Sequence, residues 1–195
     1  FTTVCAISWV EWLEENNFCE FYKIASKDIT NIPLIKAVAE TRKPVIISTG
    51  MSNDIKEIET AFEVAEKSTR VALTHCVSAY PVQHEDCNLK TIQTLKNYFG
   101  CPVGWSDHTA GVKGPVCAAI AHEADLIEVH LTLSRAMKGS DHAASLEPPG
   151  LEAVVSWVRE CEKMTGTGYL PKPEAVNKTR AKYETSVLEK IRETF

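Results

Sequence analysis

Several signatures are missing from this 195-residue chain. No glycine-rich G-x-G-x-x-G or P-loop motif follows an apolar run, which argues against a nucleotide-binding fold. No apolar stretch reaches the roughly 18 residues of a membrane span and no signal peptide is recognisable, so a cytoplasmic protein with no membrane partner is expected. Basic residues are the minority, 21 against 26 acidic ones with a net charge of −5, which disfavours nucleic acid as a partner.

The seven cysteines contain no C-x-x-C pair, and their number is odd. This pattern disfavours both a disulfide framework and a structural zinc site. Most of them lie in apolar runs, as Cys5 and Cys117 do. We therefore expect reduced and buried thiols.

Ordinary globular composition, with 44% hydrophobic and 24% charged residues, predicts a chain with a substantial core. Short apolar runs alternate with longer segments of helical spacing. The expected strands are 2–7, 21–25, 44–48, 71–77, 102–106 and 125–131. The expected helices are 9–16, 32–40 (with Asn31 as N-cap), 53–67, 88–99, 114–123 and 151–164. Six βα units imply a parallel sheet, either doubly wound or closed as a (β/α)₈ barrel.

Polar residues follow most of these expected strands, which favours the barrel. Barrel enzymes build their sites from the carboxyl ends of several strands, whereas an open sheet uses one switch point. The polar strand ends are Lys23 with Ser26, 48–50, His75 with Ser78 and Tyr80, 106–108, and His130 with Thr132. We predict an α/β fold in which residues 1–165 form an incomplete (β/α)₈ TIM barrel of about six units. Residues 166–195 are expected to form a linker and a C-terminal helix.

Two histidines, His108 and His130, end neighbouring strands. Two imidazoles there would suit a divalent metal with positions left open for water and substrate oxygen. The alternative is a pair of hydrogen-bonded histidines in the core or at its rim. Without thiolate ligands, a labile manganese-like ion fits better than structural zinc.

An anion site is suggested by Lys23, which lies inside an apolar strand and must meet an anion or lose its charge. It could anchor phosphate or carboxylate, form a Schiff base, or reach solvent at an edge. Ser48, Ser78 and Ser106 end different strands and suit a phosphate, although turn serines are common. The ring of Tyr80 suits a sugar face or simple packing at the rim.

A polar loop follows the last expected strand, at residues 138–148. Its Asp141 and His142 would cover the site as part of a lid, or belong to a plain surface connection.

Together these motifs resemble the sialic acid synthase family. The residues that carry the resemblance are 23–26, 30–31, 33–34, 43–51, 75–81, 85–89, 104–109, 128–130 and 139–148, within a match that runs from about residue 21 to 165. The resemblance implies a barrel enzyme that condenses phosphoenolpyruvate with an N-acetylated amino sugar such as N-acetylmannosamine. The products would be an N-acetylneuraminate-type nonulosonic acid and phosphate.

Carried over by motif, His108 and His130 match metal ligands, with Mn²⁺ expected ahead of Mg²⁺ or Co²⁺. Lys23 and Asp28 match catalytic positions, and Asp28 is expected to handle protons. The implied substrate-binding residues are Ser26, Ser48, Ser78, Tyr80, Ser106 and Asp141. Tyr80 and Asp141 are assigned to the sugar, and Lys23, Ser48, Ser78 and Ser106 to phosphoenolpyruvate.

The family pattern also contains parts that are not in this sequence. Family barrels begin with two further βα units, and a C-terminal antifreeze-like domain reaches the partner subunit's sugar site. We therefore expect this chain to be part of a longer protein, a homodimer when complete, and to have little activity alone. The alternatives are a catalytically inactive barrel fragment that binds or interacts, and another phosphoenolpyruvate–aldose synthase that uses a phosphorylated sugar.

Overall fold

The computed structural model describes residues 1–166, 168, 174, 176–183 and 192. Six strands form one parallel sheet in chain order, with each strand paired to the next. They are β1 (Thr2–Val4), β2 (Tyr22–Ile24), β3 (Val45–Ser48), β4 (Val71–Cys76), β5 (Val103–Asp107) and β6 (Ile127–Val129). The α/β class and the six parallel strands are as predicted.

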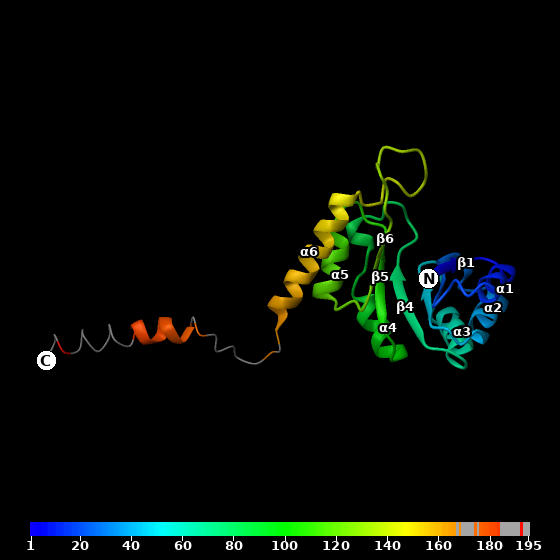
Figure 1. Ribbon diagram of the computed structural model, residues 1–195, viewed down its shortest axis with the longest axis horizontal. Helices are drawn as coiled ribbons and strands as arrows, with labels where there is room; N and C mark the ends of the chain where they lie inside the picture. Colours follow the sequence, from blue (N-terminus) through cyan, green and yellow to red (C-terminus); the bar gives the residue numbers. More distant parts are fainter. Residues whose placement is uncertain (167, 169–173, 175, 184–191, 193–195) are drawn as a thin grey trace. The chain divides into compact units, whose positions relative to one another are not determined.

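A helix follows each strand, because parallel neighbours need a crossover connection. The helices are α1 (Ile7–Glu15), α2 (Ile32–Glu40), α3 (Ile55–Glu66), α4 (Thr91–Phe99), α5 (Lys113–Ala121) and α6 (Pro148–Thr165). Two short 3₁₀ turns, η1 (Ser26–Asp28) and η2 (His84–Asp86), lie in the connections after β2 and β4. Figure 1 shows α1, α2 and α3 grouped beside the first strands, and α4 and α5 beside the later ones.

Local sequence explains where the helices begin and end. The Asn31 side chain accepts a hydrogen bond from Leu34 N, which confirms the predicted N-cap of α2. Asp54 caps α3 by accepting from the backbone of Lys56 and Glu57. Gly100 ends α4 with a φ of 63°, in the left-handed region that suits glycine. The first strand is shorter than the predicted 2–7, because α1 begins already at Ile7.

The core lies between the sheet and its helices, and the sheet curves into a half-barrel. Tyr22, Ile24, Ile47, Leu73 and Trp105 are completely buried. The other face of the sheet is concave and carries polar side chains. The barrel prediction requires eight strands that close into a ring. The structure has six strands, so the closure stays a prediction.

Cysteine burial differs from the prediction. Cys19, Cys76 and Cys87 are buried, but Cys5 and Cys117 are exposed. Cys5 follows the last residue of β1, and Cys117 on α5 lines a surface hollow together with residues of the connection after β4, so their apolar neighbours do not enclose them. For Cys117 the apolar run predicted the helix correctly and the burial wrongly, and for Cys5 both the strand and the burial were predicted wrongly.

The chain divides into two compact units, residues 1–161 and 162–195. In the second unit residues 176–183 are helical, and most of the helix expected from Lys178 onward lies outside the described residues. The expected boundary at residue 165 stays a prediction. Within the described part of the chain, no helix has both the length and the apolar character needed to span a membrane.

Candidate active site

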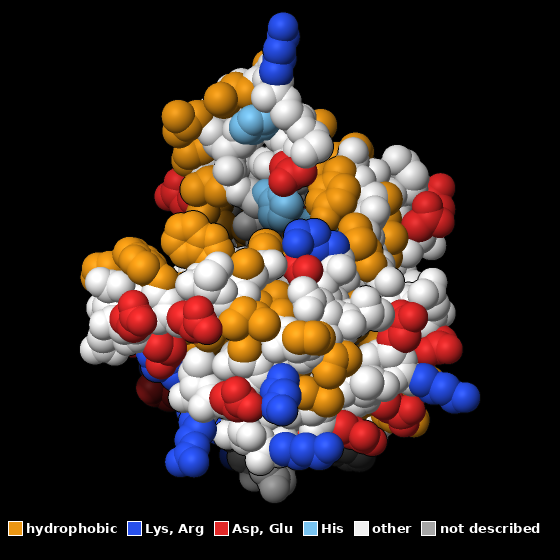
Figure 2. All heavy atoms as spheres, turned by 90° about the vertical axis from the view of Figure 1, so that its right-hand side faces the viewer, with side chains coloured by type: hydrophobic (Ala, Val, Ile, Leu, Met, Phe, Trp, Pro, Cys, Tyr) orange, Lys and Arg blue, Asp and Glu red, His pale blue; other side chains and the backbone are white. Residues whose placement is uncertain are grey.

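A cavity of about 260 Å³ lies on the concave side of the sheet at the carboxyl ends of the strands. Its lining brings together seven of the predicted site residues: Lys23, Ser26, Ser48, Tyr80, Ser106, His108 and His130. Thr3, Ala25, Lys27, Met51 and Glu128 complete the wall. Figure 2 shows this hollow, where histidine, basic and acidic side chains meet among hydrophobic ones.

At the centre of the cavity, Lys23 meets a carboxylate. Its Nζ lies 3.3 Å from Oε1 of Glu128, and only 8% of Lys23 is exposed. Of the two outcomes expected for this lysine, an anionic partner or the loss of its charge, the structure shows the anionic partner, which is an internal carboxylate. A charged, partly desolvated lysine can exchange this partner for the phosphate or carboxylate of a ligand.

The two histidines lie close together, with ring centroids 5.3 Å apart. Nδ1 of His108 lies 2.7 Å from the carbonyl oxygen of Val77, so it donates its proton there and Nε2 keeps its lone pair. Burial lowers the pKa of His108, which favours the neutral form that binds metals. On the other ring, Nδ1 of His130 lies 3.5 Å from Oδ2 of Asp141.

The donor set fits a labile cation better than a structural metal. Among the described residues, no group of three or more His, Cys, Asp or Glu side chains is arranged to hold a metal ion. A backbone hydrogen bond at Nδ1 of one imidazole fixes which of its nitrogens is available to a metal. Two adjacent imidazoles would leave the remaining coordination positions of a cation to water and substrate oxygen. The ring centroids of Tyr80 and His108 lie 4.2 Å apart, so the Tyr80 ring borders the place where a cation would bind.

Hydroxyl groups surround the lysine. Oγ of Ser48 lies 2.8 Å from Oγ1 of Thr74, and Oγ of Ser26 accepts from the backbone of Gly50 at 3.2 Å. Ser78, another predicted site residue, is not among the residues that line the cavity, and its buried Oγ has no hydrogen-bond partner among the described residues. A buried hydroxyl without a partner is costly, so a ligand atom that reaches Ser78 would be stabilised there.

Two residues of the polar strand ends do not face the cavity. His75 packs on Trp105 and lies 2.8 Å from the carbonyl oxygen of Cys87, and burial lowers its pKa. Asp107 accepts hydrogen bonds from Trp105 and Thr109 on the convex side, and burial raises its pKa. Alternate residues of a strand point to opposite faces, so the grouping of these residues with the site was wrong.

Asp28 lies near the site but does not line it. Its carboxylate is 2.6 Å from Nζ of Lys27, which does line the cavity. The Asp28 carboxylate is paired with a lysine and does not reach the cavity directly. The expected proton transfer by Asp28 therefore stays a prediction.

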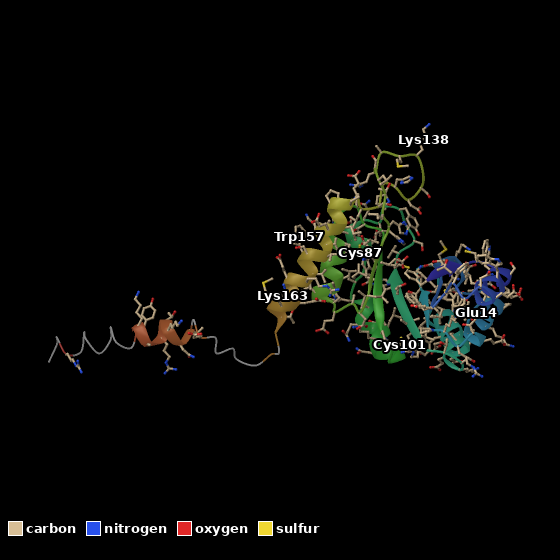
Figure 3. All side chains as sticks on the ribbon, viewed as in Figure 1. Glu14, Cys87, Cys101, Lys138, Trp157 and Lys163 are labelled. Atoms are coloured by element: carbon tan, nitrogen blue, oxygen red, sulfur yellow. The ribbon has the colours of Figure 1, made fainter. Side chains whose placement is uncertain are left out.

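The loop after β6 forms a second hollow, of about 480 Å³, beside the first. Its lining includes His130, Asp141 and His142. Nδ1 of His142 lies 2.8 Å from Oγ1 of Thr132, which holds the loop against the end of β6. Gly139 has a φ of 153°, and a Cβ there would lie 2.8 Å from the His142 ring, so the turn depends on glycine. Figure 3 shows Lys138 at the tip of this loop.

Sequence reasoning missed Glu128 and Lys27 as cavity residues. Glu128 could have been found, because it lies two positions before His130 and strand alternation puts both side chains on one face. Lys27 lies in the η1 turn, where no periodicity indicates the direction of a side chain.

Comparisons with known proteins show the family to which this chain belongs. The sequence model of the NeuB family matches residues 1–169. The chain is 42% identical over 153 residues to the N,N'-diacetyllegionaminic acid synthase of Campylobacter jejuni, covering 76% of this chain and 45% of that protein. It is 37% identical over 160 residues to the N-acetylneuraminate-9-phosphate synthase of Homo sapiens, covering 81% and 44%.

A solved structure is also similar. The N-acetylneuraminic acid synthetase of Leptospira borgpetersenii, crystallised with citrate, superimposes with a TM-score of 0.81 at 38% identity. The match covers 94% of this chain and 64% of that one. The chain spans about half the length of the curated relatives that it matches.

Proposed function

Because this chain belongs to the NeuB family, the sialic acid synthases, we propose that it carries the active site of a phosphoenolpyruvate-condensing synthase. The second substrate would be an N-acetylated amino sugar, and the products a nonulosonic acid and phosphate. The observation that carries the proposal is the cavity in which the Lys23 ammonium, several hydroxyls and two imidazoles converge.

In this proposal Lys23 binds the phosphoenolpyruvate anion, and Ser48, Ser78 and Ser106 donate hydrogen bonds to it. The unpartnered Ser78 hydroxyl and the desolvated lysine support this assignment. C3 of phosphoenolpyruvate attacks the aldehyde carbon of the sugar, water adds at C2, and phosphate leaves. Positive charge that develops at C2 is stabilised by the carboxylate of Glu128, the one acidic side chain among the described residues that line the cavity.

His108 and His130 would hold a divalent cation, Mn²⁺ in our proposal, which when bound polarises the aldehyde oxygen. Tyr80 offers a ring face to the sugar, and Asp141 accepts hydrogen bonds from its hydroxyls. The position of Asp141 beside His130 supports this division of the site into an anion end and a sugar end.

We further propose that the active barrel has eight strands, two of them from outside this chain, and that the complete protein is a homodimer. The order β1 to β6 leaves the outer edges of β1 and β6 without strand partners among the described residues. We expect the 195-residue chain alone to form little keto acid, and robust product formation by it would contradict this part of the proposal.

The sugar is proposed to be N-acetylmannosamine or a close relative. A phosphorylated sugar is the second candidate, because Lys27 adds a further basic group to the cavity wall and one relative is named as a 9-phosphate synthase. The two candidate sugars are distinguished by comparing how fast the full-length gene product forms keto acid from N-acetylmannosamine and from its 6-phosphate.

The test of the proposal is Mn²⁺ binding together with keto-acid formation. We expect His108→Ala and His130→Ala to weaken Mn²⁺ binding and to lower kcat/KM at least about 100-fold in the full-length gene product. His122→Ala, a change at a histidine outside the cavity, is the matched control and should leave both unchanged. Full metal-dependent activity in the double alanine variant would refute the metal assignment.

A further inference from the structure

We propose that Asp107 is a positioning residue that holds the His108 imidazole in place from the opposite side of the sheet. The proposal rests on the function proposed above, because it concerns the presentation of His108 to a cation. Only 3% of Asp107 is exposed, and the mechanism above makes no use of its carboxylate.

Both carboxylate oxygens of Asp107 are occupied by donors from the same chain segment. Nε1 of Trp105 donates to Oδ1 at 2.8 Å, and Oγ1 of Thr109 donates to Oδ2 at 3.0 Å. Trp105 is completely buried in the core, whereas Thr109 follows His108 directly. The carboxylate therefore ties the chain beyond His108 to a fixed ring of the core.

The backbone and ring of His108 are held by a second segment, the one that follows β4. Val82 N donates to the carbonyl oxygen of His108 at 2.9 Å, and Val82 forms an isolated parallel bridge with Thr109. The carbonyl oxygen of Val77 accepts from Nδ1 of the ring. A shift of Thr109 would therefore disturb the backbone contact and, through it, the direction of the imidazole.

The first turn of α5 closes this arrangement from outside. A Cβ at Gly114 would lie 2.6 Å from Oδ1 of Asp107 and 2.5 Å from Oγ1 of Thr109. No side chain fits between the helix and the carboxylate. Burying a carboxylate is costly, and two directed hydrogen bonds in so tight a space set the geometry more sharply than apolar packing would.

The test compares two substitutions on the same face of β5. Asp107→Ala leaves Trp105 and Thr109 without their acceptor, while Val103→Ala removes buried methyl groups at the other end of the strand and leaves those hydrogen bonds intact. We expect the Kd for Mn²⁺ to rise about 10-fold or more in Asp107→Ala. It should rise less in Asp107→Asn, which keeps one acceptor oxygen, and stay within about twofold in Val103→Ala.

A merely structural role predicts a different result. Asp107→Ala and Val103→Ala, both measured well below their melting temperatures, would then bind Mn²⁺ equally, and the proposal would be overturned. If the unsubstituted protein bound no Mn²⁺, the proposed function would fail instead. The positioning role is then tested by hydrogen exchange at the amides of Val82 and Thr109. It requires these amides to exchange faster in Asp107→Ala than in the unsubstituted protein, and not faster in Val103→Ala.

Discussion

Nζ of Lys23 on β2 lies 3.3 Å from Oε1 of Glu128 on β6, although three strands separate them in the sheet. Adjacent strands are about 4.8 Å apart, so a flat sheet would hold β2 and β6 roughly 19 Å apart. The contact therefore requires the sheet to curl strongly toward its polar face. It also means that an anionic ligand of Lys23 competes with an internal carboxylate.

The first prediction follows from this competition. Glu128→Gln should bind inorganic phosphate about fivefold more tightly, because removing a partly buried opposing charge is worth ~1 kcal/mol. Lys23→Met should lose phosphate binding. Isothermal titration with phosphate measures both, with Glu123→Gln at an exposed site as the control. Weaker phosphate binding in Glu128→Gln would contradict the prediction.

The second prediction concerns acid sensitivity. Burial lowers the pKa of His75 in the folded state below the ordinary value of 6.5, so below pH 6.5 the unfolded chain binds a proton that the folded protein does not. The stability present above pH 6.5 should therefore be lost as the pH falls toward the folded-state pKa. His75→Gln should show a shallower fall in the free energy of unfolding, measured by urea denaturation between pH 7.5 and roughly 5.

Some pH dependence should remain in that variant, because burial also lowers the pKa of His108. Leu73→Ala on the same strand is the control, since it lowers stability without removing a titrating group. A slope that is identical in His75→Gln and in the unsubstituted protein would show that His75 does not contribute.

The third prediction separates two roles of glycine. A Cβ at Gly104 would lie 2.5 Å from the backbone oxygen of Leu126, so Gly104→Ala must push β5 and β6 apart and should cost about 3 kcal/mol. Gly100 has open space but a φ of 63°, so Gly100→Ala should cost only about 1 kcal/mol. Thermal or urea unfolding measures both, and equal costs would refute the steric argument.

The fourth prediction concerns helix capping. The Asp54 carboxylate accepts from Lys56 N at 2.9 Å and from Glu57 N at 3.1 Å, whereas Asn31 makes one 3.4 Å bond. Asp54→Ala should therefore cost about 1 kcal/mol of unfolding free energy, and Asn31→Ala less. Asp54→Ser, which keeps an acceptor, should restore most of the loss. A larger cost for Asn31→Ala would reverse the expected order.

The sequence by itself determined the order and type of the elements. Apolar runs and helical spacing depend on neighbours along the chain, so six βα units, the cap at Asn31 and the polar strand ends could be identified without a structure. The same patterns placed Lys23, Ser48, Ser106 and His108 at one end of the sheet, where a single cavity collects them.

The tertiary structure alone decided which of these side chains meet. Alternation along a strand separates His75 from Cys76 and Asp107 from His108, but the sequence does not say which of the two faces holds the cavity. The Lys23–Glu128 contact depends on the curvature of the whole sheet, and the exposure of Cys5 and Cys117 on how closely other elements cover them. The curvature of the sheet and the burial of a side chain by other elements are long-range properties, because residues far apart in the chain produce them.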